Sequence, residues 1–160
     1  MTFRVLPIEP DVLDELRKSD DAGREPQIRI EDDEYGQPLR CCLQRSRPGE
    51  RIALVSYAPL RRWARDNDAE PGAYEEVGPV FIHAEACDGP EGPEWPEPLR
   101  GDRRVLRAYN GNGEILGGSL LDGKTALSER TADDLLLDPE VALVHVRAVE
   151  HGCFLFEVRR

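Results

Sequence analysis

The chain has 160 residues, of which 33% are charged and 39% hydrophobic, and its formal net charge is −11. This composition is typical of a folded domain and excludes a disordered chain. The negative charge repels nucleic acid phosphates and anionic membrane surfaces, so we expect neither as a partner. The first residues hold no apolar stretch long enough for a signal peptide, which predicts a cytoplasmic protein.

We expect a single domain over residues 1–160, with 88–98 as a proline-rich acidic surface loop. Pro10 fits the first turn of a helix, and Gly23 would end that helix. The acidic run Glu31–Glu34 is interpreted as a solvated loop. The other elements expected in the first half are a strand at Thr2–Leu6, a strand at Ile52–Tyr57, a short helix at Arg61–Asp68 and a strand at Gly78–Glu85.

The second half begins with the strongest hairpin signal in the chain, the turn Asn110–Gly113 between strands at Arg104–Tyr109 and Glu114–Leu121. A helix follows at Thr125–Leu137, which Pro139 should end. Strands outnumber helices, and at least two connections look like hairpins. The sequence therefore predicts an α+β fold with a mostly antiparallel sheet of about six to eight strands and two main helices.

The stretch Val141–Arg159 alternates apolar and polar residues like two strands, and the loop length between them decides the register. A three-residue loop, Glu150-His151-Gly152, separates an apolar from a polar face and places Gly152 where positive φ is needed. The predicted pairs are Val144–Val158, His145–Glu157, Val146–Phe156, Arg147–Leu155, Ala148–Phe154 and Val149–Cys153.

Short motifs follow one another in order from about Pro38 to Arg159. They are Pro38-Leu39-Arg40 with Leu43, Pro48-Gly49-Glu50, Tyr74 followed by Gly78-Pro79-Val80-Phe81, Arg107-Ala108-Tyr109, and Val144-His145-Val146-Arg147 with Gly152-Cys153. With them the chain resembles a bacterial family known only as the domain of unknown function number twelve hundred and three. It departs from that pattern at Leu39, where a cysteine is usual, and around His83 and Cys87, where many members place a histidine before the apolar strand. The resemblance implies no activity.

Histidine and cysteine side chains offer two further chemistries, metal binding and thiol nucleophilicity. The side chains of zinc-ligand type considered together are His83, Cys87, His145, His151 and Cys153. Because their spacing matches no compact zinc motif, we expect no metal, no cofactor and four reduced cysteines. A thiol nucleophile, Cys153 or Cys42, would need a nearby histidine oriented by Glu157. Along the hairpin Cys153 is too far from His145 for direct proton transfer.

The predicted site is a small-anion site on the polar face of the sheet, built from Arg107, Tyr109, His145 and Arg147. His145, held by Glu157, is the candidate proton donor or acceptor, so these two are the catalytic candidates. In the competing interpretation each arginine pairs with an acid such as Glu157, Glu85 or Glu114. Two classes of protein stay open: a small-molecule-binding protein or enzyme, and a non-catalytic interaction or structural domain without a ligand pocket. A deep pocket with convergent Arg and His would favour the first.

Overall fold

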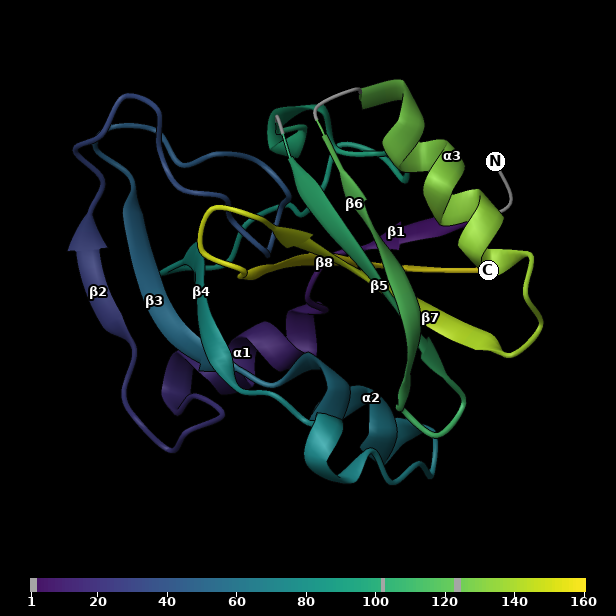
Figure 1. The fold of residues 1–160 in the computed structure, drawn as a ribbon. Coiled ribbons are helices and arrows are strands. Elements are labelled where there is room, and N and C mark those ends of the chain that lie inside the picture. Colours follow the sequence, from purple (N-terminus) through teal and green to yellow (C-terminus); the bar gives the residue numbers. More distant parts are fainter. Residues whose placement is uncertain (1–2, 102, 123–124) are drawn as a thin grey trace.

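The computed structural model describes residues 3–101, 103–122 and 125–160, the side chains of residues 125–127 excepted. Within these residues the chain forms three α-helices and eight strands in two antiparallel sheets, so the predicted α+β fold is confirmed (Figure 1). The helices are α1 (Pro10–Lys18), α2 (Pro59–Asp66) and α3 (Thr125–Leu136). The strands are β1 (Arg4–Leu6), β2 (Gln27–Ile30), β3 (Arg51–Tyr57), β4 (Gly78–His83), β5 (Arg104–Asn110), β6 (Ile115–Leu121), β7 (Val141–Ala148) and β8 (Phe154–Arg159). No helix in the described part of the chain is long and apolar enough to cross a membrane.

The larger sheet has the strand order β1-β8-β7-β5-β6 and is covered on both faces. Inward residues of β5, β7 and β8 pack on one face against Ala132 and Leu136 of α3. On the other face, Tyr109 and Leu143 pack against Trp63 and neighbouring residues of α2. The face predicted to be polar therefore lies against a second layer of the structure.

That second layer is the sheet β2-β3-β4, with α1 packed on it. Leu13 and Leu16 of α1 contribute to a core shared with apolar residues of β3 and β4. Cys41 and Cys42, in the connection between β2 and β3, are buried in the same core. Figure 1 shows the smaller sheet beside the larger one, with α1 and α2 along the same side of the molecule.

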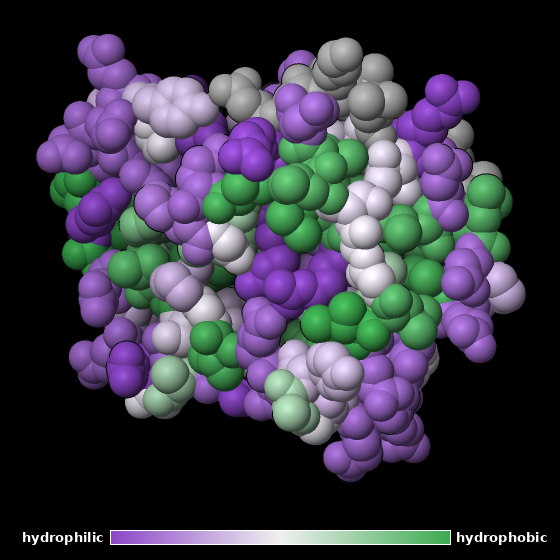
Figure 2. Space-filling view, viewed as in Figure 1, coloured by the Kyte–Doolittle hydropathy of each residue, from purple (hydrophilic) through white to green (hydrophobic). Residues whose placement is uncertain are grey.

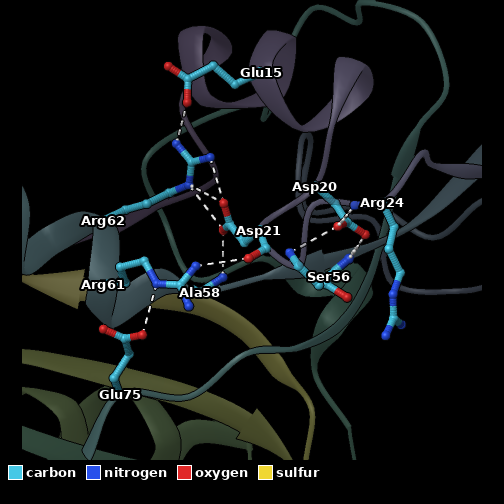
Figure 3. A network of polar contacts seen from close by, with 10 residues as sticks. Glu15, Asp20, Asp21, Arg24, Ser56, Ala58, Arg61, Arg62 and Glu75 are labelled. Atoms are coloured by element: carbon cyan, nitrogen blue, oxygen red, sulfur yellow. Dashed lines mark hydrogen bonds and ion pairs between the residues drawn. The ribbon is translucent and has the colours of Figure 1, made fainter. Parts of the chain in front are cut away.

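A polar network joins the loop after α1 to the start of α2 (Figure 3). Asp21 accepts hydrogen bonds from the Ala58 amide (2.7 Å) and from the Arg62 guanidinium (2.8 Å). The N-terminus of α2 has no side-chain cap of its own, so Asp21 supplies both an acceptor and a negative charge there. Asp20 binds the Ser56 amide of β3 at 2.9 Å. These contacts fix the loop and α2 to one end of the smaller sheet.

The C-terminal hairpin has the predicted register in its central pairs. Val146 lies opposite Phe156, and His145 lies opposite Glu157. Gly152 has a φ of 72°, as the three-residue loop requires. These features of the prediction are confirmed.

A β-bulge beyond Val146 changes the register near the loop. Arg147 pairs with Phe154, so the predicted pairs of Arg147 with Leu155 and of Ala148 with Phe154 are wrong. The extra residue turns the Phe154 ring toward the second layer, where its centroid lies 5.5 Å from that of Tyr57. Leu155 stays in the core next to α3. Packing between the layers thus compensates for the lost ladder regularity.

Two other segments differ from the sequence expectation. Strand β2 was not predicted, and Glu31, expected in a solvated loop, is 1% exposed. Its carboxylate accepts hydrogen bonds from the Ser46 hydroxyl and from the amides of Asp32 and Asp33. In the proline-rich stretch 88–98, Trp95 is buried against Phe156, with ring centroids 5.0 Å apart.

Candidate functional site

The four residues predicted to form the site lie together between the two layers. Arg107 is opposite His145 in the pairing of β5 with β7. The Tyr109 ring lies 4.8 Å from the His145 ring, and Arg107 donates to the Tyr109 hydroxyl at 3.3 Å. We call Arg107, Tyr109, His145 and Arg147 the polar-face cluster.

Glu76, which is not among the residues of the predicted site, pairs with both guanidinium groups of this cluster. It accepts hydrogen bonds from Arg107 at 2.6 Å and from Arg147 at 3.0 Å. Burial alone would raise the pKa of the Glu76 carboxyl. The hydrogen bond from Arg107 and the charge of Arg147 have the opposite and larger effect, so the pKa lies below its ordinary value. Arg147 and Glu76 line a cavity of about 500 Å³. Both arginines thus already hold a carboxylate.

His145 and Glu157 form a buried pair, with Nε2 and Oε2 3.2 Å apart and the two residues 1% and 7% exposed. Glu157 also pairs with Arg159. Burial opposes ionisation of Glu157, yet the contacts with His145 and Arg159 bring its pKa below the ordinary value. His145 Nδ1 is buried without a hydrogen-bond partner among the described residues. This geometry fits an Nε2–H tautomer oriented by Glu157 and places the catalytic candidates away from solvent.

A second cavity of about 540 Å³, which shares Pro79, His151 and Cys153 with the first, opens between the two sheets. Three arginines line it, Arg40, Arg45 and Arg104, and we call it the arginine cavity. His151 and Cys153 of the β7–β8 loop line it too, together with the acidic residues Asp33 and Glu150. Figure 2 shows hydrophilic side chains gathered in the middle of the visible face, where β8 runs, with hydrophobic ones above and below.

Arg40 is the most buried arginine of this cavity, 3% exposed. Within the described residues its guanidinium donates to the main-chain carbonyls of Phe154 (2.8 Å) and Pro38 (2.5 Å), and to no carboxylate. Burial lowers the pKa of Arg40 to about 10, and the charges of Arg45 and Arg104 also lower it. The group is still a cation at neutral pH, and a buried cation without a counter-ion is costly.

The other two arginines are held in place by the surrounding loops. Arg104 donates to the Leu99 carbonyl at 2.7 Å and lies 3.8 Å from Glu150. Arg45 stacks over the Tyr35 ring at 4.0 Å and donates to the Gly36 carbonyl. Gly36 has a φ of 73°, and a Cβ there would clash with the Ser46 carbonyl oxygen, so this turn requires glycine.

A third group, the thiol cluster, comprises Cys41, Cys42, His83 and Cys87, whose ligand atoms all lie within 4.8 Å of one another. By residue type alone, His83 and Cys87 belong with His145, His151 and Cys153 as side chains of zinc-ligand type. The structure instead joins them to Cys41 and Cys42, while His151 and Cys153 line the arginine cavity. The two short local spacings, Cys41-Cys42 and His83-x₃-Cys87, were the signal in the sequence. All four cysteines of the chain are free thiols.

Fold and site together define an α+β domain of two packed antiparallel sheets, with charged and thiol-bearing side chains gathered between and beside the layers. Residues 36–160 match the model of a family described as "Protein of unknown function (DUF1203)", so the chain belongs to this family, as its resemblance predicted. Comparison with curated proteins and with solved structures gives no match.

Proposed function

We propose that this protein binds a small molecule carrying a carboxylate or phosphate group in the arginine cavity. The observation that carries the proposal is the buried Arg40 guanidinium, which lines the cavity and has no carboxylate partner within the described residues. Planar guanidinium groups bind carboxylate and phosphate oxygens in bidentate geometry. A ligand anion would supply the counter-charge that Arg40 lacks.

The arginine cavity is a better place for the anion than the polar-face cluster, which the sequence had predicted as the site. In the polar-face cluster Glu76 already occupies the guanidinium groups of Arg107 and Arg147. In the arginine cavity three guanidiniums meet two carboxylates, Asp33 and Glu150. A volume of about 540 Å³ is within the range of small-molecule sites.

The four free thiols support a cytoplasmic location, because reducing compartments keep cysteines unpaired. We assign no reaction to the cavity. His151 and Cys153 line it, but the Cys153 thiol is directed to the His151 carbonyl, at 3.8 Å, rather than to an imidazole.

A second candidate function, a protein-interaction domain, is favoured by apolar side chains on two edge strands. Ile28 and Ile30 of β2 are 46% and 55% exposed, and Leu120 of β6 is 59% exposed. Both strands are at the edge of their sheets, where backbone groups are open to pairing with another chain.

Calorimetric titration with sulfate and with inorganic phosphate tests the anion proposal. We expect saturable binding of one anion per chain to the wild-type protein, and about tenfold to hundredfold weaker binding in Arg40→Gln, since charge-assisted hydrogen bonds contribute about 1.5–3 kcal/mol. Arg45→Gln removes a second cavity guanidinium from a less buried position and should weaken binding in the same direction.

Arg107→Gln is the matched control, because it makes the same change of charge in the polar-face cluster. It should bind sulfate as the wild type does. Circular dichroism and a thermal unfolding curve would establish that each variant is folded. Equal loss of sulfate binding in Arg107→Gln and unchanged binding in folded Arg45→Gln would refute the assignment to the arginine cavity.

A further inference from the structure

The thiol cluster draws its four ligand-type side chains from three separate places in the chain. Cys41 and Cys42 lie in a tight turn closed by the bond from the Leu43 amide to the Leu39 carbonyl, 2.9 Å. His83 is the last residue of β4, and Cys87 follows in the next loop. A hydrogen bond from the Arg40 amide to the Phe81 carbonyl, 3.0 Å, attaches the turn to β4. The fold itself therefore brings the side chains together.

We propose that Cys41, Cys42, His83 and Cys87 bind one zinc ion. Three thiolates and one imidazole are a ligand set of structural zinc sites, which are tetrahedral and closed to substrate. The donor atoms share one small volume, with every pair within 4.8 Å.

The distances to the imidazole agree with tetrahedral coordination. Zinc–sulfur bonds of about 2.3 Å and zinc–nitrogen bonds of about 2.0–2.1 Å at tetrahedral angles place sulfur and nitrogen roughly 3.6 Å apart. His83 Nδ1 lies 3.5 Å from the Cys41 sulfur and 3.8 Å from the Cys42 sulfur. The imidazole thus already faces the thiols through the nitrogen that would bind the metal.

The other nitrogen of His83 has the partner expected of a zinc ligand. His83 Nε2 lies 2.8 Å from a carboxylate oxygen of Glu50, so an N–H there donates to Glu50. A carboxylate behind a metal-binding histidine fixes the tautomer and the orientation of the ring and makes its free nitrogen more basic. Glu50 is therefore a positioning residue of this site.

Backbone amides are directed at all three sulfur atoms of the cluster. The His83 amide donates to the Cys41 sulfur at 3.2 Å. The amides of Gln44 and Gly89 likewise form hydrogen bonds with Cys42 and Cys87. Amide donors favour thiolates over thiols, and zinc binds thiolates. Arg17, which donates to the carbonyls of His83 (3.1 Å) and Glu85 (3.0 Å), places a positive charge beside the cluster.

A bound zinc ion would cross-link parts of the chain that are far apart in the sequence. Cys42 and His83 are separated by 41 positions, so zinc would close a long loop and stabilise the folded state. This cross-link would also fix the turn that contains Arg40, the central arginine of the arginine cavity. Zinc therefore has a structural role that does not depend on the anion proposal.

Elemental analysis of the full chain, purified without chelator, is the direct test. We expect about one zinc per chain. After removal of zinc, addition of cobalt(II) should give the sulfur-to-metal charge-transfer bands and the strong ligand-field bands of a tetrahedral thiolate site. A wild-type protein that holds no zinc after reconstitution and gives no such spectrum would overturn the proposal.

Two pairs of variants locate the site. Cys87→Ser removes the exposed ligand and should greatly weaken zinc binding, whereas Cys153→Ser, which changes the cysteine outside the cluster, should leave it unchanged. Glu50→Gln should weaken zinc binding about tenfold to hundredfold, while Glu85→Gln, whose carboxylate pairs with Arg51 instead, should not. Equal effects of the two cysteine variants would refute the location, and an unchanged affinity in Glu50→Gln would refute the positioning role.

Thiol alkylation followed by peptide mass spectrometry separates zinc from the two alternative chemistries. With zinc bound, we expect rapid labelling of Cys153 and protection of the three cluster thiols, which chelation removes. A disulfide within the cluster, or fast labelling of Cys42 that zinc does not slow, would show a redox pair or a reactive nucleophile and would overturn the zinc site. Because Cys87→Ser could lose stability, its fold would be checked by circular dichroism, and the cobalt spectrum of the wild type stands independently.

Discussion

The polar-face cluster and the arginine cavity both contain arginines, but they differ in whether a carboxylate of the protein pairs with the central guanidinium groups. Arg107 and Arg147 share the carboxylate of Glu76. Arg40 has main-chain carbonyls around its guanidinium and no carboxylate within the described residues. The polar-face cluster has two arginines and the arginine cavity three, so both could attract an anion. The presence of a counter-charge from the protein itself decides which guanidinium is open to a ligand.

The comparison also explains why the first cluster looks like a site in the sequence. Strand alternation places Arg107 beside His145, as expected, but Glu76 comes from the segment before β4, outside the larger sheet. No strand pattern within β5 or β7 indicates which loop will cover their face. Four variants or conditions test the contrast, taken from the largest expected effect to the smallest.

Truncating a core side chain of the larger sheet, the sheet that holds the polar-face cluster, should have the largest effect on stability. Phe156 is fully buried and packs edge-on against Trp95. Phe156→Ala should lower the free energy of unfolding by about 3–5 kcal/mol, because a core aromatic leaves a cavity. Denaturant titration measures this, and a change well under about 1 kcal/mol would show that the face toward α3 is not the core.

Acidification should lower the stability of the folded protein, because it protonates the carboxylates that pair with the polar-face cluster. The pKa of Glu157 and that of Glu76 are below the ordinary 4.5 in the folded protein, so their stabilisation is present above about pH 4.5 and is lost as pH falls through the lower folded values. Denaturant titrations between pH 7 and pH 3 should show this decline. Glu157→Gln should flatten it, and an equally steep decline in that variant would contradict the role of Glu157.

Arg147→Gln tests whether the polar-face cluster is structural. Arg147 pairs with Glu76, whose side chain is 46% exposed, and donates to the Gly152 carbonyl. Solvent screening limits the ion pair to about 0–1 kcal/mol, so we expect a loss of stability of about 1 kcal/mol including the carbonyl contact. Sulfate binding should be unchanged. Normal stability combined with lost sulfate binding would instead identify this cluster as the ligand site.

Glu76→Gln should have the smallest effect on stability. It should also turn the polar-face cluster into a second anion-binding place. The substitution leaves Arg107 and Arg147 without their carboxylate, at a cost below about 1 kcal/mol for so exposed a partner. The two freed guanidiniums should then bind an anion, so calorimetry should find two sulfate ions per chain instead of one. A stoichiometry that stays at one would mean that the missing counter-charge alone does not make this cluster a site.

Much of the fold followed from local patterns in the sequence. Alternation and one glycine were enough to predict the pairing of Val146 with Phe156. The bulge at Leu155 was not predictable, because it depends on the packing of Phe154 against Tyr57, which is far away in the chain. Strand β2 was missed since its four residues are all exposed and carry no burial pattern.

The proposed sites were less predictable than the fold, for a related reason. Each depends on segments that tertiary structure alone brings together. The Arg40 guanidinium reaches the Phe154 carbonyl across 114 positions, and Cys41 meets His83 across 42. Spacing rules for metal motifs apply to ligands within one or two local turns, so they predicted no metal here.

The pairing of β1 with β8 has a consequence for how the molecule folds. Val5 lies opposite Val158, so β1, near the start of the chain, lies beside β8 at its end (Figure 1). Closing a loop of some 150 residues costs about 2.4 kcal/mol more entropy than closing one of ten, and this cost precedes any gain from pairing. Strand β1, which comes before the family-matched region 36–160, should therefore join after β5, β7 and β8 have assembled. In pulse-labelling hydrogen exchange during refolding, the amides of β7 should be protected before those of β1.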